Sequence, residues 1–361
     1  MDKRVDNFCA GPCTLPFSVL EDVRDELINF ANTGMSIIED SHRSPSYDAI
    51  HHETLNLFRN LANVPEDFAV LFLQGGATLQ FAQVPLNLLS ENQKSGYINT
   101  GSWADKALTD AKKIANTYEA WSGLQEGFIR TPNCNEITIQ PNTRYIHMTS
   151  NETINGIRFP TYPDVDIPLV ADMSSDLLSR PIDWSRFDLI YGGIQKNLGP
   201  AGVTVVVVRR SRLGTHGRNL PSYLDYQTHD DAHSLMNTPP MFSIYVMNKV
   251  LNWMAEVGGV QEFETRATKR SALIYETIDQ SNEWYRSPVD KKCRSHMNVI
   301  FHLPSKVLEK KFIDQAIELG MVNLKGHRNV GGIRASIYNA MQIESVERLA
   351  EFMNAYKKSN S

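Results

Sequence analysis

Short apolar runs alternate with longer amphipathic stretches along most of the chain. The runs Ala69–Leu73, Phe187–Tyr191 and Val203–Val208 are rich in β-branched or aromatic residues and are bounded by turn residues, as is typical of buried strands. Helices are predicted near Val19–Asn32 and Tyr47–Leu61. The other predicted strands are Ser95–Asn99, Arg144–Met148 and Leu169–Ala171. This alternation predicts an α/β fold, a three-layer sandwich around a mostly parallel sheet.

The second half of the chain contains a long helical stretch, from Ser243 to about Ser281, that is interrupted by Gly258-Gly259. A more compact section with a βαβ-like pattern follows, with elements at Met297–His302, Val307–Leu319, Gly332–Ile337 and Ile343–Tyr356. Because a glycine pair favours the end of a helix, we place a domain boundary there. We expect a large domain over residues 16–257, and a smaller α/β domain formed by residues 1–15 and 258–361.

Composition and charge narrow the class of protein. With 361 residues, 42% of them hydrophobic and 21% charged, the chain is long enough for about two globular domains. A net charge of −5 leaves no basic surplus for a nucleic-acid backbone, so no nucleic-acid partner is expected. The first residues lack the apolar core of a signal peptide, and no apolar run is long enough to cross a bilayer. We therefore expect a cytoplasmic protein without a membrane partner.

The cysteines give no sign of a disulfide framework or of a metal site. Cys9, Cys13, Cys134 and Cys293 form neither a CxxC pair nor a zinc-type spacing with histidine. Free thiols in a reducing compartment are expected, and no metal ligands are predicted.

The turn GGIQKNLGPAG, residues 192–202, carries one lysine, Lys196, between two predicted buried strands. A buried ammonium group loses its hydration, so it either pairs with an anion or gives up its proton. A neutral lysine is a nucleophile that can form a Schiff base with a carbonyl compound. A surface lysine in a loop is the alternative, and it is the commoner case for a lysine taken alone. The neighbours of Lys196 therefore decide between the two.

Three further features could accompany Lys196. Asp172 follows a predicted strand, where its carboxylate could hold a protonated ring nitrogen. The turn Gln74–Thr78 leads from a strand into a predicted helix, whose free N–H groups suit a phosphate. Trp103 follows another strand, and it could be a core residue, an interface residue or a stacking partner of an aromatic cofactor. Together the four features are what pyridoxal 5′-phosphate requires.

Basic residues elsewhere in the chain suit an acidic substrate. His42 and Arg43 lie in a predicted loop between the first two helices, whereas His327, Arg328 and Arg334 lie in the predicted small domain. Arginine binds carboxylates and phosphates with two parallel hydrogen bonds. A surface salt bridge is the preferred explanation for Arg328 taken alone. It is not preferred for Arg334, because an alternating apolar segment follows that residue.

Several motifs together resemble those of the phosphoserine aminotransferase family, a class V branch of the fold-type I pyridoxal-phosphate enzymes. The resemblance extends from about Asn7 to Tyr356 and implies that the large domain binds the cofactor. The matching stretches are Asn7-Phe8 with Gly11-Pro12, Ser41–Arg43, Gln74–Phe81, Asn151–Gly156, Gly193–Gly202, Asn237–Pro240 and Lys325–Ala340. Thr78 departs from one branch of the family, which has an arginine at this position.

The resemblance implies a role for each matched residue. Two residues would be catalytic, with Lys196 forming the Schiff base and Asp172 holding the pyridine nitrogen. The other cofactor contacts would be Trp103 stacked on the ring, Thr153 at the ring hydroxyl, Gly76, Ala77, Thr78 and Gln195 at the phosphate, and Asn237 and Thr238 from the neighbouring subunit of a homodimer. The substrate contacts would be Arg334 at the α-carboxylate, and His42, Arg43, His327 and Arg328 at the distal phosphate or side-chain carboxylate.

The implied reaction transfers the amino group of L-glutamate to 3-phosphooxypyruvate, giving O-phospho-L-serine and 2-oxoglutarate in serine biosynthesis. A further use in pyridoxine biosynthesis, through 4-phosphohydroxy-L-threonine, is also implied. Another class V reaction stays open as the alternative, either a different transamination or cysteine desulfuration, although no cysteine lies in an evident loop beside the site. A binding protein with a degenerate fold would be expected to lack Lys196 or Asp172, and both are present.

Overall fold

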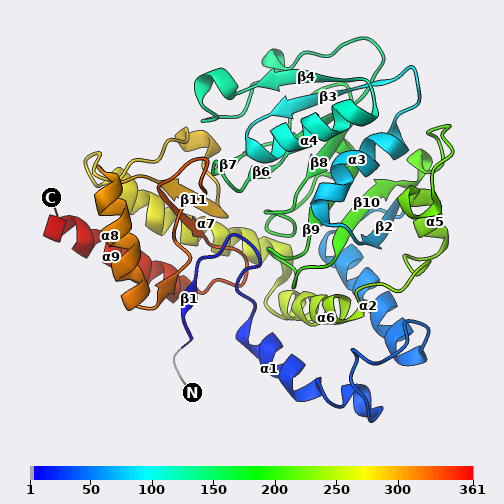
Figure 1. Cartoon of the computed structure of the whole chain (residues 1–361), viewed down its shortest axis with the longest axis horizontal. Helices are drawn as coiled ribbons and strands as arrows, with labels where there is room; N and C mark the ends of the chain where they lie inside the picture. The colour runs from blue at the N-terminus through cyan, green and yellow to red at the C-terminus, as the bar shows by residue number, and fades with distance from the viewer. Residues whose placement is uncertain (1–3, 361) are drawn as a thin grey trace.

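The computed structural model describes residues 4–360, in which a large body built around one sheet adjoins a smaller body (Figure 1). In this part of the chain the central sheet has seven strands, in the order β2-β10-β9-β8-β5-β3-β4. Only β10 runs antiparallel to its neighbours, so the predicted mostly parallel sheet is confirmed. The strands are β2 (Phe68–Leu73), β3 (Lys94–Asn99), β4 (Thr117–Ser122), β5 (Thr143–Thr149), β8 (Leu169–Asp172), β9 (Phe187–Gly193) and β10 (Thr204–Arg209).

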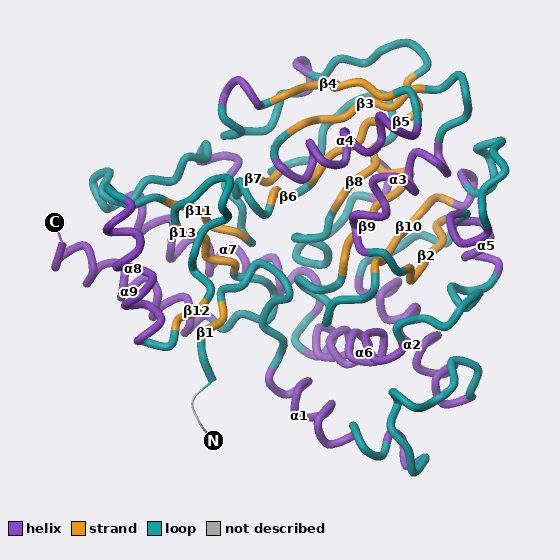
Figure 2. Tube along the Cα trace, in the orientation of Figure 1, coloured by secondary structure: helices purple, strands orange, loops and turns teal. Residues whose placement is uncertain are grey.

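Helices cover both faces of this sheet, which gives three layers (Figure 2). Because successive side chains of a strand point to opposite faces, Val205 and Val207 of β10 pack in one core, and Val206 and Val208 pack in the other. The first core includes residues of α1 (Phe17–Glu26), α2 (Pro45–Leu61) and α6 (Met241–Glu256). The second includes residues of α3 (Gly76–Leu88), α4 (Ser102–Ile114) and α5 (Tyr226–Asp231).

One helix joins the two bodies. The long helical stretch divides at Gly258-Gly259, as predicted, and continues as α7 (Gly259–Asp279). Both glycines have positive φ, 117° and 70°, a conformation in which a side chain would be strained. Val260 and Phe263 of α7 belong to the core of the large sheet, whereas Ile274 belongs to the core of the smaller body.

The smaller body contains two short sheets covered by helices. Its elements are β1 (Asp6–Asn7), β11 (Asn298–Phe301), α8 (Lys306–Glu318), β12 (Met321–Val322), β13 (Ile333–Ser336) and α9 (Ile343–Asn360). The predicted βαβ-like section is wrong in its pairing: β11 and β13 are antiparallel, and the strand after α8, β12, pairs with β1 instead. The predicted domain limits, 16–257 against 1–15 with 258–361, stay a prediction, and residues 1–3 and 361 lie outside the described residues.

The prediction of one helix over Val19–Asn32 is wrong at its end. Helix α1 stops at Glu26, and a 3-10 turn at Phe30–Asn32 follows, in which Ala31 has a left-handed φ of 49°. A backbone hydrogen bond from Phe30 to Met35 closes this segment into a loop. The sequence also gave no sign of β4, an edge strand whose side chains are mostly half-buried and which therefore lacks an apolar run.

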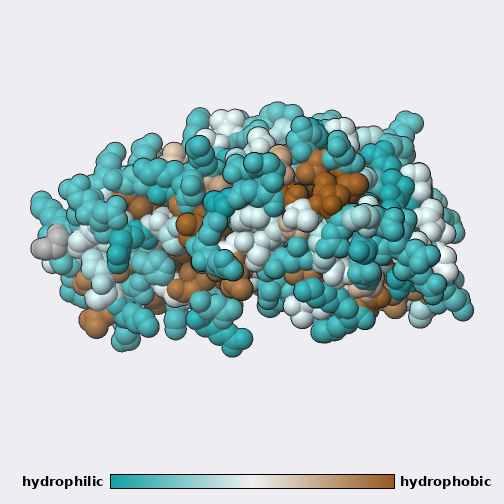
Figure 3. All heavy atoms as spheres, turned by 90° about the horizontal axis from the view of Figure 1, so that it is seen from above, coloured by the Kyte–Doolittle hydropathy of each residue, from teal (hydrophilic) through white to brown (hydrophobic). Residues whose placement is uncertain are grey.

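The surface carries separate hydrophobic patches on a largely hydrophilic background in the view of Figure 3. Among residues 4–360, no helix combines the length and the hydropathy that a membrane span requires.

Candidate active site

The candidate site lies where the parallel strands of the central sheet end. Strand pairing aligns Asp172, the last residue of β8, with Tyr191 of β9. On the other side, Gly193 at the end of β9 is aligned through Thr204 of β10 with Leu73 at the end of β2. The segments after these strands therefore leave the sheet on one edge. In parallel α/β sheets this carboxyl edge is where ligands bind.

Lys196 is buried in the turn between β9 and β10, with 8% of its surface exposed. The turn is closed by a hydrogen bond from the N–H of Leu198 to the carbonyl of Ile194 at 3.0 Å, and both of these side chains are fully buried. Lys196 Nζ donates to Oγ1 of Thr153 at 2.7 Å and lies 5.7 Å from the ring centroid of Trp103. The expectation that the flanking strands carry the lysine inside is confirmed.

The charges around the lysine are buried with it. Burial lowers the pKa of Lys196, the carboxylates of Asp172 and Glu152 oppose this shift, and the positive charge of Arg334 adds to it. Burial raises the pKa of Asp172, and the charge of Lys196 opposes that shift. The Asp172 carboxylate also accepts a hydrogen bond from the N–H of Ser174 at 2.8 Å. Burial thus shifts the pKa of each group toward its neutral form, and the attraction between the two charges opposes both shifts.

The glycine turn before α3 leaves an open helix N-terminus. Gly75 and Gly76 have φ angles of 90° and 67°. A Cβ atom on Gly75 would lie 2.5 Å from Leu79 Cδ2, whereas one on Gly76 would meet nothing within 4 Å. No side chain caps this helix, whose first turn continues through Ala77 and Thr78. Free N–H groups and the positive end of the helix dipole suit a phosphate at this position.

Thr238 lies beside this turn and beside one of the predicted substrate residues. Its carbonyl accepts a hydrogen bond from Gln74 Nε2 at 3.0 Å, and its Oγ1 lies 3.3 Å from His42 Nδ1. The Nδ2 of Asn237 donates to the same carbonyl at 3.4 Å. Arg43, next to His42 in the chain, is exposed. The structure therefore brings His42 and Thr238 together within one chain.

The predicted substrate residues of the smaller body form a second group. Arg334 lies on β13, burial lowers its pKa, and its Nε is buried without a hydrogen-bond partner among the described residues. Burial also lowers the pKa of His327, and the charges of Arg334 and Arg328 lower it further. Arg328 itself is exposed. Arg334 is thus the member of this group whose charge reaches Lys196.

The N-terminal segment packs on the lysine turn, which the sequence did not predict. The N–H of Cys13 donates to the carbonyl of Gln195 at 3.2 Å, and its Sγ donates to the carbonyl of Lys196. Burial raises the pKa of the Cys13 thiol to about 12, so it keeps the proton that it donates. From the smaller body, the N–H of Asn339 donates to Oδ1 of Asn197 at 3.1 Å. These contacts join distant parts of the chain, and no sequence pattern points to them.

Glu152 lies in a matched motif, but no role was predicted for it from the sequence. It is fully buried, and burial raises its pKa to about 7. Hydrogen bonds from the backbone of Ala104 and Trp103 oppose this rise. An acidic residue directly before Thr153, in a segment matched as a cofactor motif, is the signal that could have drawn attention to it.

The residues present fit a flat, phosphorylated cofactor. The Trp103 ring centroid lies 5.7 Å from Lys196 Nζ, its buried Nε1 has no hydrogen-bond partner among the described residues, and the open end of α3 offers a place for a phosphate. A three-layer α/β fold with a buried lysine at the carboxyl edge of its sheet defines the class of fold-type I pyridoxal-phosphate enzymes. Within that class, the chain belongs to the aminotransferase class-V family, whose model matches residues 5–349.

Relatives extend this assignment along the whole chain. Phosphoserine aminotransferase from Halalkalibacterium halodurans is 48% identical over 359 residues, which cover 99% of both proteins. The solved phosphoserine aminotransferase from Bacillus circulans subsp. alkalophilus has a TM-score of 0.97 and 48% identity, again over 99% of each chain. That of Trichomonas vaginalis, with pyridoxal phosphate bound, has a TM-score of 0.92 and 34% identity, over 97% of this chain and 100% of that one. The predicted family resemblance and fold class are confirmed.

Proposed function

We propose that the protein transfers the amino group of L-glutamate to 3-phosphooxypyruvate, giving O-phospho-L-serine and 2-oxoglutarate, with pyridoxal 5′-phosphate as cofactor. Similarity to phosphoserine aminotransferases over 99% of the chain supports this reaction. The observation that carries it is Lys196, a buried amine 2.7 Å from the hydroxyl of Thr153 and under the influence of the Asp172 carboxylate.

Lys196 and Asp172 are the proposed catalytic residues. When bound, the cofactor supplies an aldehyde that condenses with amines and a ring that accepts the electrons released at the substrate α-carbon. Since burial lowers the pKa of Lys196, its Nζ can act as a neutral nucleophile, and it removes and returns the proton at the substrate α-carbon. Asp172 would hold the proton on the pyridine nitrogen through a charge-assisted hydrogen bond.

The remaining cofactor contacts are proposed for the residues that match the family motifs. Trp103 would stack on the ring, and the hydroxyl of Thr153 would bond the hydroxyl group of the ring. The proposed phosphate contacts within one chain are Gly76, Ala77, Thr78 and Gln195.

The basic residues provide the substrate site. Arg334 is proposed to bind the α-carboxylate, because its buried Nε has no hydrogen-bond partner among the described residues. The side chains of His42, Arg43, His327 and Arg328 bind the distal phosphate, or the side-chain carboxylate when glutamate is the substrate. A simple oxoacid requires one arginine, so the surplus of donors suits a dianion.

A homodimer with shared sites is proposed, in which Asn237 and Thr238 complete the phosphate site of the partner. The loop between α1 and α2 supports a partner surface, because it exposes Ile28 and Ile38 at 79% and 62%. Mixing a Lys196→Ala chain with a Thr238→Ala chain tests this arrangement. One site of the mixed dimer then has neither defect, so activity returns. If Thr238 served its own chain, both sites would stay defective and mixing would restore nothing.

The reaction belongs to serine biosynthesis in this proposal, with a second use in pyridoxine biosynthesis through 4-phosphohydroxy-L-threonine. The cytoplasm is the proposed location, since charged phosphorylated oxoacids do not cross a bilayer without a carrier.

Product analysis tests the proposed reaction. The purified protein with L-glutamate and 3-phosphooxypyruvate is expected to form O-phospho-L-serine, visible by phosphorus NMR, in step with 2-oxoglutarate. Its visible absorbance should change when glutamate alone is added. Release of sulfur from cysteine without any transamination would instead favour the alternative class V reaction, a cysteine desulfurase.

A further inference from the structure

Helix α4, which carries Trp103, has no cap of its own. Its first residue is Ser102, and the preceding Gly101 has no side chain that could bond the free N–H groups of the first turn. Those groups are bonded from elsewhere in the fold. Glu152 accepts hydrogen bonds from the N–H of Trp103 at 3.1 Å and of Ala104 at 2.8 Å, one on each carboxylate oxygen.

Glu152, whose carboxylate accepts these bonds, belongs to a small hairpin formed by β6 (Asn151–Glu152) and β7 (Ile157–Arg158). Asn155 of the same hairpin accepts from the N–H of Ser102 at 3.3 Å. A Cβ atom on Gly101 would lie 2.7 Å from Asn155 Oδ1 and 2.8 Å from the carboxyl carbon of Glu152. The hairpin therefore approaches the start of α4 so closely that only glycine fits between them.

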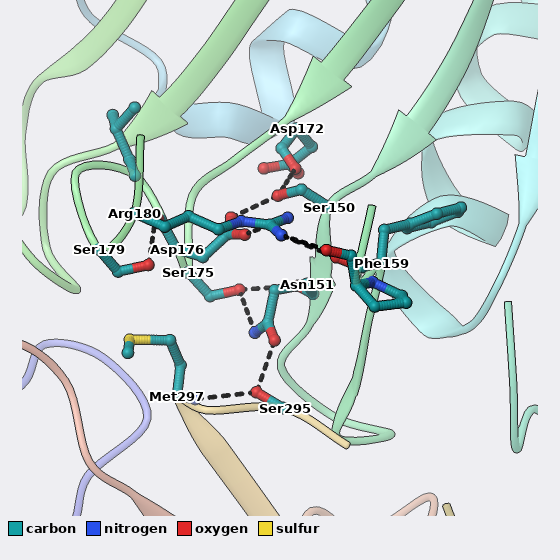
Figure 4. A network of polar contacts seen from close by, with 12 residues as sticks. Ser150, Asn151, Phe159, Asp172, Ser175, Asp176, Ser179, Arg180, Ser295 and Met297 are labelled. Carbon is teal, nitrogen blue, oxygen red and sulfur yellow. Dashed lines mark hydrogen bonds and ion pairs between the residues drawn. The ribbon is translucent and has the colours of Figure 1, made fainter. Parts of the chain in front are cut away.

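This hairpin is anchored on its other side. In Figure 4 the side chain of Asn151 points between Ser175 and Ser295. Its Nδ2 donates to Oγ of Ser175 at 2.8 Å and to Oδ1 of Asn298 at 2.9 Å, and its Oδ1 accepts from Ser295. All of these groups are buried. Asn151, at the start of the hairpin, is thus hydrogen-bonded to both bodies of the molecule. These bonds hold the backbone next to Glu152 in place.

Trp103 is not held by a hydrogen bond of its own ring. Its Nε1 is buried and has no partner within the described chain, and the residue as a whole is half-buried. The ring lies 5.7 Å from Lys196 Nζ and 4.4 Å from Lys106 Nζ. Thr153, which bonds Lys196, directly follows Glu152. The indole and the lysine are therefore positioned by adjacent residues of one hairpin.

We propose that Glu152 is a positioning residue: by capping α4 it fixes the Trp103 indole where it faces Lys196. On the proposed function, this sets the orientation in which the cofactor ring is held. Two acceptor oxygens, one for each N–H, are required, since an amide offers one acceptor and places an NH₂ group against the other donor.

The test compares holoenzyme variants by visible circular dichroism per bound cofactor, cofactor dissociation constant, kcat and unfolding midpoint. Glu152→Gln keeps the shape of the side chain, and Glu152→Asp is the conservative rescue. The matched control is Ser305→Ala, which removes the N-cap bond to Leu308 from α8, a helix of 13 residues like α4. The visible signal reports the cofactor and not the oxoacid, so failure of the proposed substrate would leave it intact.

Glu152→Gln is expected to lose most of the visible signal and about ten- to a hundredfold in kcat, because a small misplacement of reacting groups costs that much. Glu152→Asp should recover part of both. Ser305→Ala should lower the unfolding midpoint only. A wild-type signal and kcat in folded Glu152→Gln would reduce Glu152 to a structural cap and overturn the proposal. If that variant does not fold, Glu152→Asp decides: a reduced signal in the folded variant supports the proposal, and a wild-type signal overturns it.

Discussion

The lysine end and the basic end of the candidate site are built on different parts of the fold. Lys196 and Asp172 are buried at the ends of central strands, where strand register determines their positions. Arg43 and Arg328, proposed for the distal phosphate, are exposed on loops. Proton transfer requires groups held in a fixed geometry, whereas a dianion can be attracted by charges on flexible stems. The two ends therefore differ in rigidity. Mutations at the buried end are expected to lower activity more than mutations at the exposed end.

The largest effect is expected for Lys196→Ala. Removing the only amine proposed to move the proton should lower transamination by roughly 10²- to 10⁴-fold or more, the range for general acid–base catalysis. Far-UV circular dichroism should show the fold retained, since the cores of both bodies are untouched. The rate is measured with saturating cofactor, and Lys196→Arg serves as a control that keeps the positive charge. Turnover of glutamate at the wild-type rate by Lys196→Ala would refute the catalytic assignment.

A second large effect is expected for Asp172→Asn, which keeps the shape and removes the buried charge. We expect kcat to fall by on the order of 10²- to 10³-fold, as for the loss of a preorganised electrostatic contact. Asp188→Asn is the matched control, because Asp188 is also a buried carboxylate of the sheet, but it lies near the start of β9 and binds Arg212 at 2.7 Å.

Asp188→Asn should lower the free energy of unfolding and leave kcat unchanged. Equal losses of kcat in the two variants would mean that losing a buried carboxylate at the carboxyl edge of the sheet harms catalysis no more than losing one at the opposite edge.

The same contrast separates what the sequence could predict from what it could not. The strands on either side of Lys196 were predictable because their residues are buried on both faces and read as continuous apolar runs. Glycine-rich turns follow such strands, and from these turns the positions of Lys196 and of the N-terminus of α3 can be predicted. These signals are local, so a single sequence contains them.

The contacts that complete the site are not local. Glu152 caps a helix that begins about fifty positions earlier, and Cys13 bonds the turn of Lys196 across a separation of 183 positions. The antiparallel pairing of β11 and β13 was likewise missed, because β12 pairs with the N-terminal strand. The helix predicted as far as Asn32 ends at Glu26 and is followed by a 3-10 segment with a left-handed Ala31, which propensity alone does not indicate.

A moderate effect is expected at the basic end of the site. Arg43→Ala and Arg328→Ala should each lower kcat/KM for 3-phosphooxypyruvate by about ten- to a hundredfold, since a charge-assisted hydrogen bond contributes roughly 1.5–3 kcal/mol. Activity toward unphosphorylated hydroxypyruvate should change little and is the internal control. An equal loss on both substrates would move these residues from phosphate recognition to carboxylate binding or folding.

The smallest effect is expected from salt, and it separates the two ends without mutation. The Debye length falls from about 10 Å at 0.1 M to about 3 Å at 1 M ionic strength, so exposed charges are screened far more than buried ones. KM for 3-phosphooxypyruvate should therefore rise a few-fold between these conditions, whereas kcat, which is proposed to depend on buried Lys196 and Asp172, should stay constant. Because the arginines are the source of the effect, Arg43→Ala should show a weaker dependence of KM on salt. A fall of kcat with constant KM would reverse the comparison, since it would make the buried end the salt-sensitive one.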